Sequence, residues 1–285
     1  MSQLFGVDAS TLRQHDPERY RALGRAAVGE VMLQTFAEWR RPGSSCRGGL
    51  VWFARDFSPA AGWGIIDSSG RAKSAYWFLK RALAPIALLA VDEGLNGLAL
   101  HAINDTPHRL EAELRVALYR EGCPFGAPAA TRLTIPARSA RSVPADRLFD
   151  RFHDITNAYR FGPGGHDVVA ASLLDPAGGD IVATAHYFPY RLPSVRDSRL
   201  QVTAYAEPID GGYSLVVEAD RFAHAVAVEA DGFVPDDNYL HLEPRRPRRL
   251  VLRAEGRGRW LSGSVSALNG VGSVHIVCRE RRDAD

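Results

Sequence analysis

Apolar residues recur at helical spacing near the start of the chain and at alternating spacing over most of the rest. Around residues 15–39, Asp16 is a plausible helix N-cap and Pro17 suits the first helical position. The pattern that follows predicts a long amphipathic helix, which must bury its apolar stripe against another element. That stripe is formed by Tyr20, Leu23, Ala27, Val31 and Thr35.

A short unbroken apolar run, GGLVWF over residues 48–53, comes next. Such a run predicts a strand buried on both faces, as in a parallel sheet covered by helices. A second helix is expected over residues 71–83. Its apolar face would be formed by Ala72, Ala75, Tyr76, Leu79 and Leu83. Helix, buried strand and helix within the first 85 residues indicate an α/β segment, whose strand needs partners on both edges.

After Pro85 the apolar residues alternate with polar ones in many short runs separated by turn sequences. Examples are the runs within residues 96–105 and 113–120. About 200 residues of this kind predict two immunoglobulin-like β-sandwiches of about 100 residues each. Because Pro189 and Pro193 interrupt the pattern, the expected domains are 1–85, 86–190 and 191–285.

Composition narrows the function classes. The 35 basic and 33 acidic residues give a net charge of +2, which predicts no nucleic-acid or anionic-membrane partner. No apolar run approaches the roughly 20 residues that span a bilayer, and the first residues lack the features of a secretory signal. We therefore expect a cytoplasmic protein, leaving open an export signal on an upstream segment. Cys46, Cys123 and Cys278 are expected to be free thiols.

One stretch of the sequence matches a known pattern. The matching residues are Gly48, Leu50, Trp52, Asp56, Pro59, Trp63, Ile66, Asp67, Gly70, Lys73, Tyr76, Lys80, Arg81 and Pro85. This stretch resembles the end of the catalytic barrel in glycoside hydrolase family 2, especially its β-mannosidase branch. The family's Gln-Leu-Asn is replaced by Phe53, Ala54 and Arg55, so the resemblance does not carry over the sugar specificity.

A second match, within residues 233–252, is similar to the carboxy-terminal sandwich of the same family. The matching residues are Phe233, Asn238, Tyr239, Leu242, Pro244 and Leu250, whereas Arg245 and Arg246 replace a Gly-Glu turn. The resemblance implies a multidomain fold, α/β plus all-β. It would comprise a terminal helix-strand-helix segment of a (β/α)8 TIM barrel, followed by two immunoglobulin-like β-sandwiches.

The resemblance also implies retaining hydrolysis of a β-linked glycoside, which needs two carboxylates about 5–5.5 Å apart. In this family they are glutamates on the fourth and seventh barrel strands, whereas residues 48–53 would be the eighth strand. Glu18, Glu30 and Glu38 fall in the first predicted helix, where a solvated position is expected. The resemblance therefore predicts no catalytic residue here and a carboxy-terminal fragment that is inactive alone. The missing barrel portion is a possible partner chain.

Two residues are candidates for contact with the substrate. The resemblance makes Trp52 a platform under the sugar, and Asp56 an acceptor for a sugar hydroxyl or a group that orients a neighbour. A core tryptophan with a loop-capping aspartate is the alternative. Arg55 could form an ion pair with Asp56, and Trp63 and Asp67 are expected to be packing and turn residues.

No cofactor or metal is expected, because the nine histidines show no ligand spacing and residues 236–238 lack that of a calcium loop. The arginines of residues 245–249 are expected in a solvated turn. An alternative function is a non-catalytic β-sandwich protein for carbohydrate binding or assembly.

Overall fold

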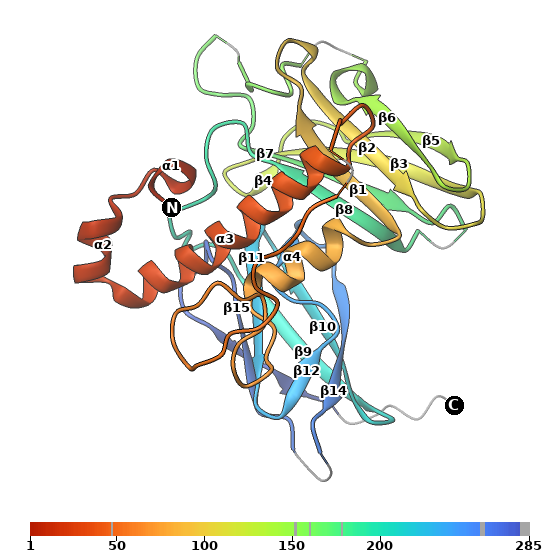
Figure 1. The fold of residues 1–285 in the computed structure, drawn as a ribbon. Helices are drawn as coiled ribbons and strands as arrows, with labels where there is room; N and C mark the ends of the chain where they lie inside the picture. The colour runs from red at the N-terminus through yellow and green to blue at the C-terminus, as the bar shows by residue number, and fades with distance from the viewer. Residues whose placement is uncertain (47, 151–152, 160, 178, 257–259, 280–285) are drawn as a thin grey trace. The chain divides into compact units, whose positions relative to one another are not determined.

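The computed structural model describes residues 1–46, 48–150, 153–159, 161–177, 179–256 and 260–279. They fold mainly into β-sheet with few helices (Figure 1). Two compact units are present, Gly24–Leu192 and a second unit that joins Met1–Leu23 to Pro193–Asp285. The predicted division at residues 85 and 190 stays a prediction. No helix in the described part of the chain combines the length and the apolar character needed to cross a bilayer.

The helices lie in the first third of the chain. Their bounds are α1 Ser2–Phe5, α2 Ala9–His15, α3 Pro17–Arg40 and α4 Ser74–Ala82. The predicted start of the long helix is confirmed, because the Asp16 carboxylate accepts a hydrogen bond from the Arg19 amide at 2.9 Å. This contact satisfies one of the amide groups that have no partner within the first helical turn.

The buried face of α3 departs from the predicted stripe in its second half. Leu23 and Ala27 are buried as expected, but Val31 is 47% exposed. Phe36 and Ala37 are buried instead, because α3 packs on a broader surface than one narrow stripe. Glu30, expected in solvent, is only 3% exposed, so the expectation of a solvated position for this acid is wrong.

Unit Gly24–Leu192 contains a β-sandwich of two sheets. One sheet has the strand order β1-β2-β6, and the other has the order β4-β3-β7-β8 with β5 also paired to β3. All the pairings are antiparallel. The bounds are β1 Ile86–Asp92, β2 Leu98–Asn104, β3 Leu110–Arg120, β4 Cys123–Pro124, β5 Ala129–Ile135, β6 Ser139–Pro144, β7 Val168–Leu174 and β8 Ile181–Tyr187. Short 3₁₀ turns lie at Gly94–Asn96 and Ala145–Leu148.

Alternation along β1 and β2 explains how the first sheet is covered on both faces. Leu88, Leu98 and Leu100 point into the core between the two sheets. Their neighbours Leu89 and Ile103 point the other way and pack with Ala37 of α3. Side chains of a strand alternate between faces, so two buried faces require apolar residues at nearly every position. This is why β2 is buried along its whole length.

The unit with Pro193–Asp285 is a second pair of sheets around one core. Their strand orders are β12-β14-β10-β9-β17 and β13-β11-β15-β16. The bounds are β9 Val202–Ile209, β10 Gly212–Ala219, β11 Ala223–Ala230, β12 Phe233–Pro235, β13 Leu240–Leu242, β14 Arg248–Ala254, β15 Gly263–Ser266, β16 Val274–His275 and β17 Val277–Cys278. Leu215 and Leu252 of one sheet share this core with Val226 and Val265 of the other.

The amino-terminal residues of this unit are held by specific contacts. Arg19 is 7% exposed, and its guanidinium donates hydrogen bonds to the carbonyls of Leu268 and Ser194. Burial, followed by repulsion from Arg196, lowers the pKa of Arg19 to about 10. The guanidinium still carries its charge at neutral pH, and buried carbonyl oxygens stabilise that charge.

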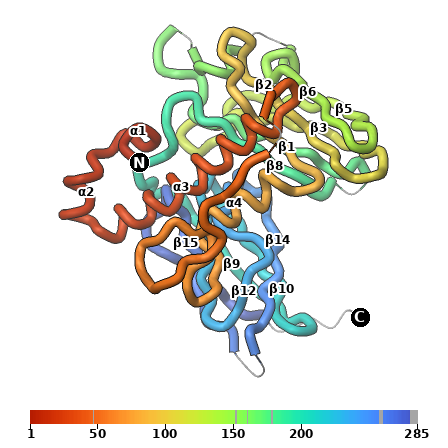
Figure 2. The backbone as a smooth tube through the Cα atoms, in the orientation of Figure 1, coloured from red at the N-terminus to blue at the C-terminus, as the bar shows by residue number. Residues whose placement is uncertain are grey.

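The predicted strand over residues 48–53 is wrong. These residues form no strand, and the first sheet-like pairings in this segment are isolated bridges from Ile66 to Arg55 and to Ala72. Figure 2 shows the path of the backbone between α3 and α4. Val51 packs beside Phe36 and Leu79, whereas Leu50 is 96% exposed. A β-strand needs neighbouring strands to hydrogen-bond with its backbone N–H and C=O groups. Among the described residues, no strand is paired with residues 48–53. Only one face of the segment is therefore covered.

Candidate functional site

Four aromatic side chains gather in the connection between α3 and α4. Phe53 is central: its ring centroid lies 5.5 Å from Trp52, 5.7 Å from Phe57 and 6.5 Å from Trp63. Trp52, Phe57 and Trp63 are 74%, 90% and 76% exposed, respectively. We call Trp52, Phe53, Phe57 and Trp63 the aromatic platform. It is an exposed apolar surface of a kind that often marks a binding site.

Asp56 anchors the loop that carries the platform. Its two carboxylate oxygens accept hydrogen bonds from the Gly64 amide and from Lys73 Nζ, each at 2.7 Å. Lys73 Nζ also donates to the Gly62 carbonyl at 2.9 Å. The hydrogen bond from Lys73, followed by that from Gly64, lowers the pKa of Asp56. The carboxylate is thus charged at neutral pH, and its hydrogen bonds connect Asp56 to Gly64 and to Lys73.

Two glycines permit this closure. A Cβ at Gly62 would overlap the Asp56 carboxylate, and a Cβ at Gly64 would approach the Asp56 amide nitrogen to 2.6 Å. Any larger side chain would therefore push the loop away from its anchor. The sequence Asp56…Gly62-x-Gly64…Lys73 is the local cause of the loop's shape.

The structure places the predicted site residues in different settings. Trp52 is at the surface, in contact with Phe53, so a packed core position is wrong for it. Asp56 is 8% exposed and holds the loop, as in the loop-capping alternative. A direct contact of either residue with a sugar stays a prediction.

Of the neighbouring residues Asp67, Trp63 and Arg55, the first matches its expected role and the second does not. Asp67 is a turn residue as expected, because its carboxylate accepts from the amides of Ser69 and Arg71. Trp63 was expected to be packed but is exposed within the platform. Arg55 donates to the Ser68 carbonyl at 2.6 Å, a bond that spans the Asp67 turn.

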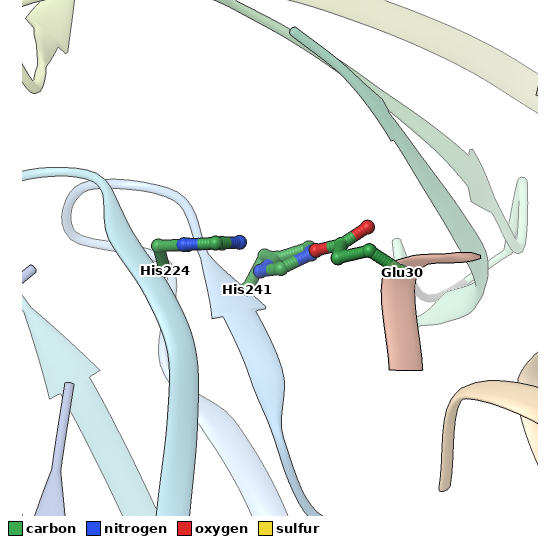
Figure 3. Close-up of side chains that lie close together, drawn as sticks. All are labelled: Glu30, His224 and His241. Atoms are coloured by element: carbon green, nitrogen blue, oxygen red, sulfur yellow. The ribbon is translucent and has the colours of Figure 1, made fainter. Parts of the chain in front are cut away.

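Two histidines that are far apart in the sequence stack in the other unit. His224 of β11 and His241 of β13 lie with ring centroids 4.7 Å apart and planes inclined by 23° (Figure 3). The Ala225 amide donates to His241 Nδ1 at 3.0 Å, which leaves the ring hydrogen of a neutral His241 on Nε2. Sequence spacing misses this pair because β11 and β13 bring the two residues together across strands. The three cysteines are free thiols.

Comparisons with known proteins identify the relatives. No family model matches the chain. Over 52 residues, 18% of this chain, it is 44% identical to β-mannosidase B of Thermothelomyces thermophilus, a match that covers 6% of that protein. Over 105 residues, 36% of this chain, it is 32% identical to β-mannosidase B of Aspergillus terreus, covering 12% of that protein.

Solved structures share the fold over far more of the chain. The β-D-mannosidase of Dictyoglomus thermophilum matches 99% of this chain with a TM-score of 0.72 and 19% identity. The exo-chitosanase of Amycolatopsis orientalis matches 90% with a TM-score of 0.65 and 15% identity. The chain spans only 32% and 34% of those structures, respectively. The chain is therefore similar to β-mannosidase-like proteins of glycoside hydrolase family 2, in fold over 99% of its length and in sequence over up to 37% of it.

Proposed function

We propose that this chain is a carboxy-terminal portion of a β-mannosidase-like retaining glycoside hydrolase that acts on β-linked sugars. The observation that carries the proposal is the fold similarity over 99% of this chain but only 32% of the D. thermophilum β-D-mannosidase. In this proposal, residues 1–85 are the last part of a (β/α)8 barrel and residues 86–285 are two immunoglobulin-like sandwiches. The remaining barrel, on the same polypeptide or on a separate chain, contributes both catalytic glutamates.

The exposed segment around residues 48–53 supports this assignment. In the proposal it takes the place of the eighth barrel strand and becomes a strand only when the remaining barrel supplies neighbours at its edges. Val51 already faces α3 and α4 through Phe36 and Leu79, as a barrel strand faces its covering helices. The exposed Leu50 and Trp52 on the other side would be covered by, or open into, the completed barrel.

We expect the purified chain to hydrolyse neither p-nitrophenyl β-mannoside nor p-nitrophenyl β-glucosaminide faster than buffer, since two closely opposed carboxylates are needed. The released nitrophenolate is coloured, so its absorbance measures the rate of hydrolysis. Turnover that disappears in Glu30→Gln, which removes the buried acid of α3, would contradict the proposal. Glu18→Gln, an exposed acid on the same helix, is the matched control.

The aromatic platform is proposed as the sugar-binding part of this chain, with Trp52 as the stacking surface and Asp56 as the residue that positions it. The axial C–H groups of a pyranose form an apolar patch that suits an indole face. We expect Trp52→Ala to weaken binding of methyl β-mannoside several-fold, measured by calorimetry on the full chain. Methyl β-mannoside is the appropriate ligand because a nitrophenyl ring would itself stack on the platform.

Trp260→Ala is the control for that experiment, because Trp260 is 91% exposed and lies outside the platform. Equal affinity of the Trp52→Ala and Trp260→Ala variants would contradict a role for Trp52. Glycan binding that persists in Trp52→Ala, without turnover, would instead favour the second candidate, a non-catalytic carbohydrate-binding sandwich. The observation that supports this second candidate is the predominance of β-structure in the chain.

A further inference from the structure

A serine, a histidine and a glutamate line up on the β1-β2-β6 sheet. His101 of β2 and Ser142 of β6 are directly opposite each other in the antiparallel pair. His101 Nδ1 lies 2.8 Å from Ser142 Oγ, and His101 Nε2 lies 3.3 Å from Glu93 Oε1. None of these residues takes part in the glycosidase proposal.

The fold brings the three side chains to one face of the sheet. Leu100 and Ala102 of β2 point into the sandwich core, so His101 between them points to the opposite face. Ile103 on that same face packs with Ala37 of α3, and Ala140 of β6 packs against this cluster. Glu93 follows β1 directly, and its amide donates to the Gly97 carbonyl to close the turn into β2.

The exposure of the three residues suits nucleophilic chemistry. The histidine is 1% exposed, whereas the serine is exposed at the sheet edge formed by β6. The Glu93 side chain is 26% exposed, and its Oε1 also lies 3.6 Å from a guanidinium nitrogen of Arg41, the residue that follows α3. A reagent can therefore approach the hydroxyl from solvent, while the imidazole lies between Ser142 on its Nδ1 side and Glu93 on its Nε2 side.

We propose that Ser142 is an activated nucleophile for acyl transfer from aryl esters, with His101 as its general base and Glu93 as the positioning residue that orients the imidazole. A serine hydroxyl is a weak nucleophile until an adjacent base removes its proton. A base that is oriented by a carboxylate meets this requirement on many unrelated folds. This activity is independent of the proposed glycoside hydrolysis.

The acyl-transfer step balances as follows for p-nitrophenyl acetate. Ser142 Oγ forms a bond to the ester carbonyl carbon, and its proton passes to His101 Nδ1. The bond between that carbon and the phenolic oxygen breaks, and the electron pair leaves with p-nitrophenolate. The products are acetyl-Ser142, a protonated His101 and the phenolate, so no oxidant or further reactant is needed.

The charges around His101 favour the base form at neutral pH. Burial is the main cause that lowers the pKa of His101, and Arg41 lowers it further, while Glu93 and Glu38 act in the opposite direction. Because the folded-state pKa lies below the ordinary value, the imidazole is neutral at pH 7. Reactivity should therefore persist through slightly acidic pH and fall only below the ordinary histidine pKa.

The test is the reaction of the full chain with excess p-nitrophenyl acetate. We expect a burst of about one nitrophenolate per chain and a mass increase of one acetyl group on the peptide that contains Ser142. Ser142→Ala should abolish the burst, whereas Ser139→Ala, on the same strand but hydrogen-bonded to the Pro136 carbonyl, should not change it. Acetylation spread over lysines, with the burst retained in Ser142→Ala, would overturn the proposal.

Two further variants separate chemistry from folding. His101→Gln should slow acetylation by roughly 10²-fold or more, the usual contribution of a general base. Glu93→Gln should shift the fall in the pH–rate profile to lower pH, because it removes a carboxylate that raises the pKa of His101. A purely structural glutamate would leave that midpoint unchanged, and an unchanged midpoint would overturn its assigned role. Mapping of the acetyl group on the unaltered chain remains decisive if His101→Gln fails to fold.

Discussion

Phe78→Ala is expected to destabilise unit Gly24–Leu192 by about 3–5 kcal/mol, the usual effect of removing a buried phenylalanine. Phe78 of α4 is fully buried, and its ring fills the space above Gly29 of α3. The contact fixes α4 against α3 and thereby the loop that joins them. Urea unfolding, together with hydrogen exchange of α3 and α4 peptides, measures the loss.

Phe57→Ala is the matched control, because Phe57 is 90% exposed and its loss should change stability by less than about 0.5 kcal/mol. A second test uses Gly29, where an added Cβ would overlap the Phe78 ring. Gly29→Ala should therefore destabilise the unaltered chain. In the Phe78→Ala background it should be neutral or stabilising by up to about 1 kcal/mol, since alanine favours helix. Additive effects would contradict the proposed contact.

Lys73→Met is expected to release the loop that carries the aromatic platform. Lys73 Nζ supplies hydrogen bonds to both Asp56 and the Gly62 carbonyl, and its loss leaves a carboxylate with one partner fewer in a mostly buried position. Chymotrypsin cleavage after Phe57 and Trp63 should become roughly tenfold faster, the scale expected for a lost charge-assisted hydrogen bond. Peptide mass spectrometry at short digestion times measures the rates.

Lys80→Met is the control for this experiment. Lys80 is on α4, whereas Lys73 is the residue just before this helix, and the Lys80 ammonium lies over the Trp77 ring, 5.5 Å from its centroid. Cleavage at an unchanged rate in Lys73→Met, or equally fast in both variants, would show that the loop is held by other contacts.

Local signals in the sequence were enough to locate several elements. The Asp16-Pro17 pair predicted the start of α3, because N-capping involves neighbouring residues only. Alternating apolar residues predicted β2 and β3, because a strand shows the same face at every second position, but this alternation did not reveal that β2 is buried on both faces. The turn at Asp67 was predicted from local residues as well, since its hydrogen bonds reach Ser69, Gly70 and Arg71, all within four residues.

Predictions of burial from the sequence were wrong where a side chain is covered or exposed because of residues far away in the chain. An unbroken apolar run at residues 48–53 matches a strand covered on both faces, yet in the described residues only α3 and α4 cover it. Trp63 likewise has an apolar side chain, but nothing in its local sequence states that it belongs to an exposed platform. Glu30 shows the reverse case, a charged residue that the fold buries.

The sequence by itself determined the start of α3, the turn at Asp67, the alternating strands and the resemblance to family 2 glycoside hydrolases, because each is encoded by residues close together or by a fixed spacing. Only the tertiary structure decided that Lys73 neutralises Asp56, 17 residues away, and that Ser142 meets His101, 41 residues away. Such pairs depend on how strands and loops close on one another. Closure is set by the packing of the whole unit and leaves no periodic mark in the sequence.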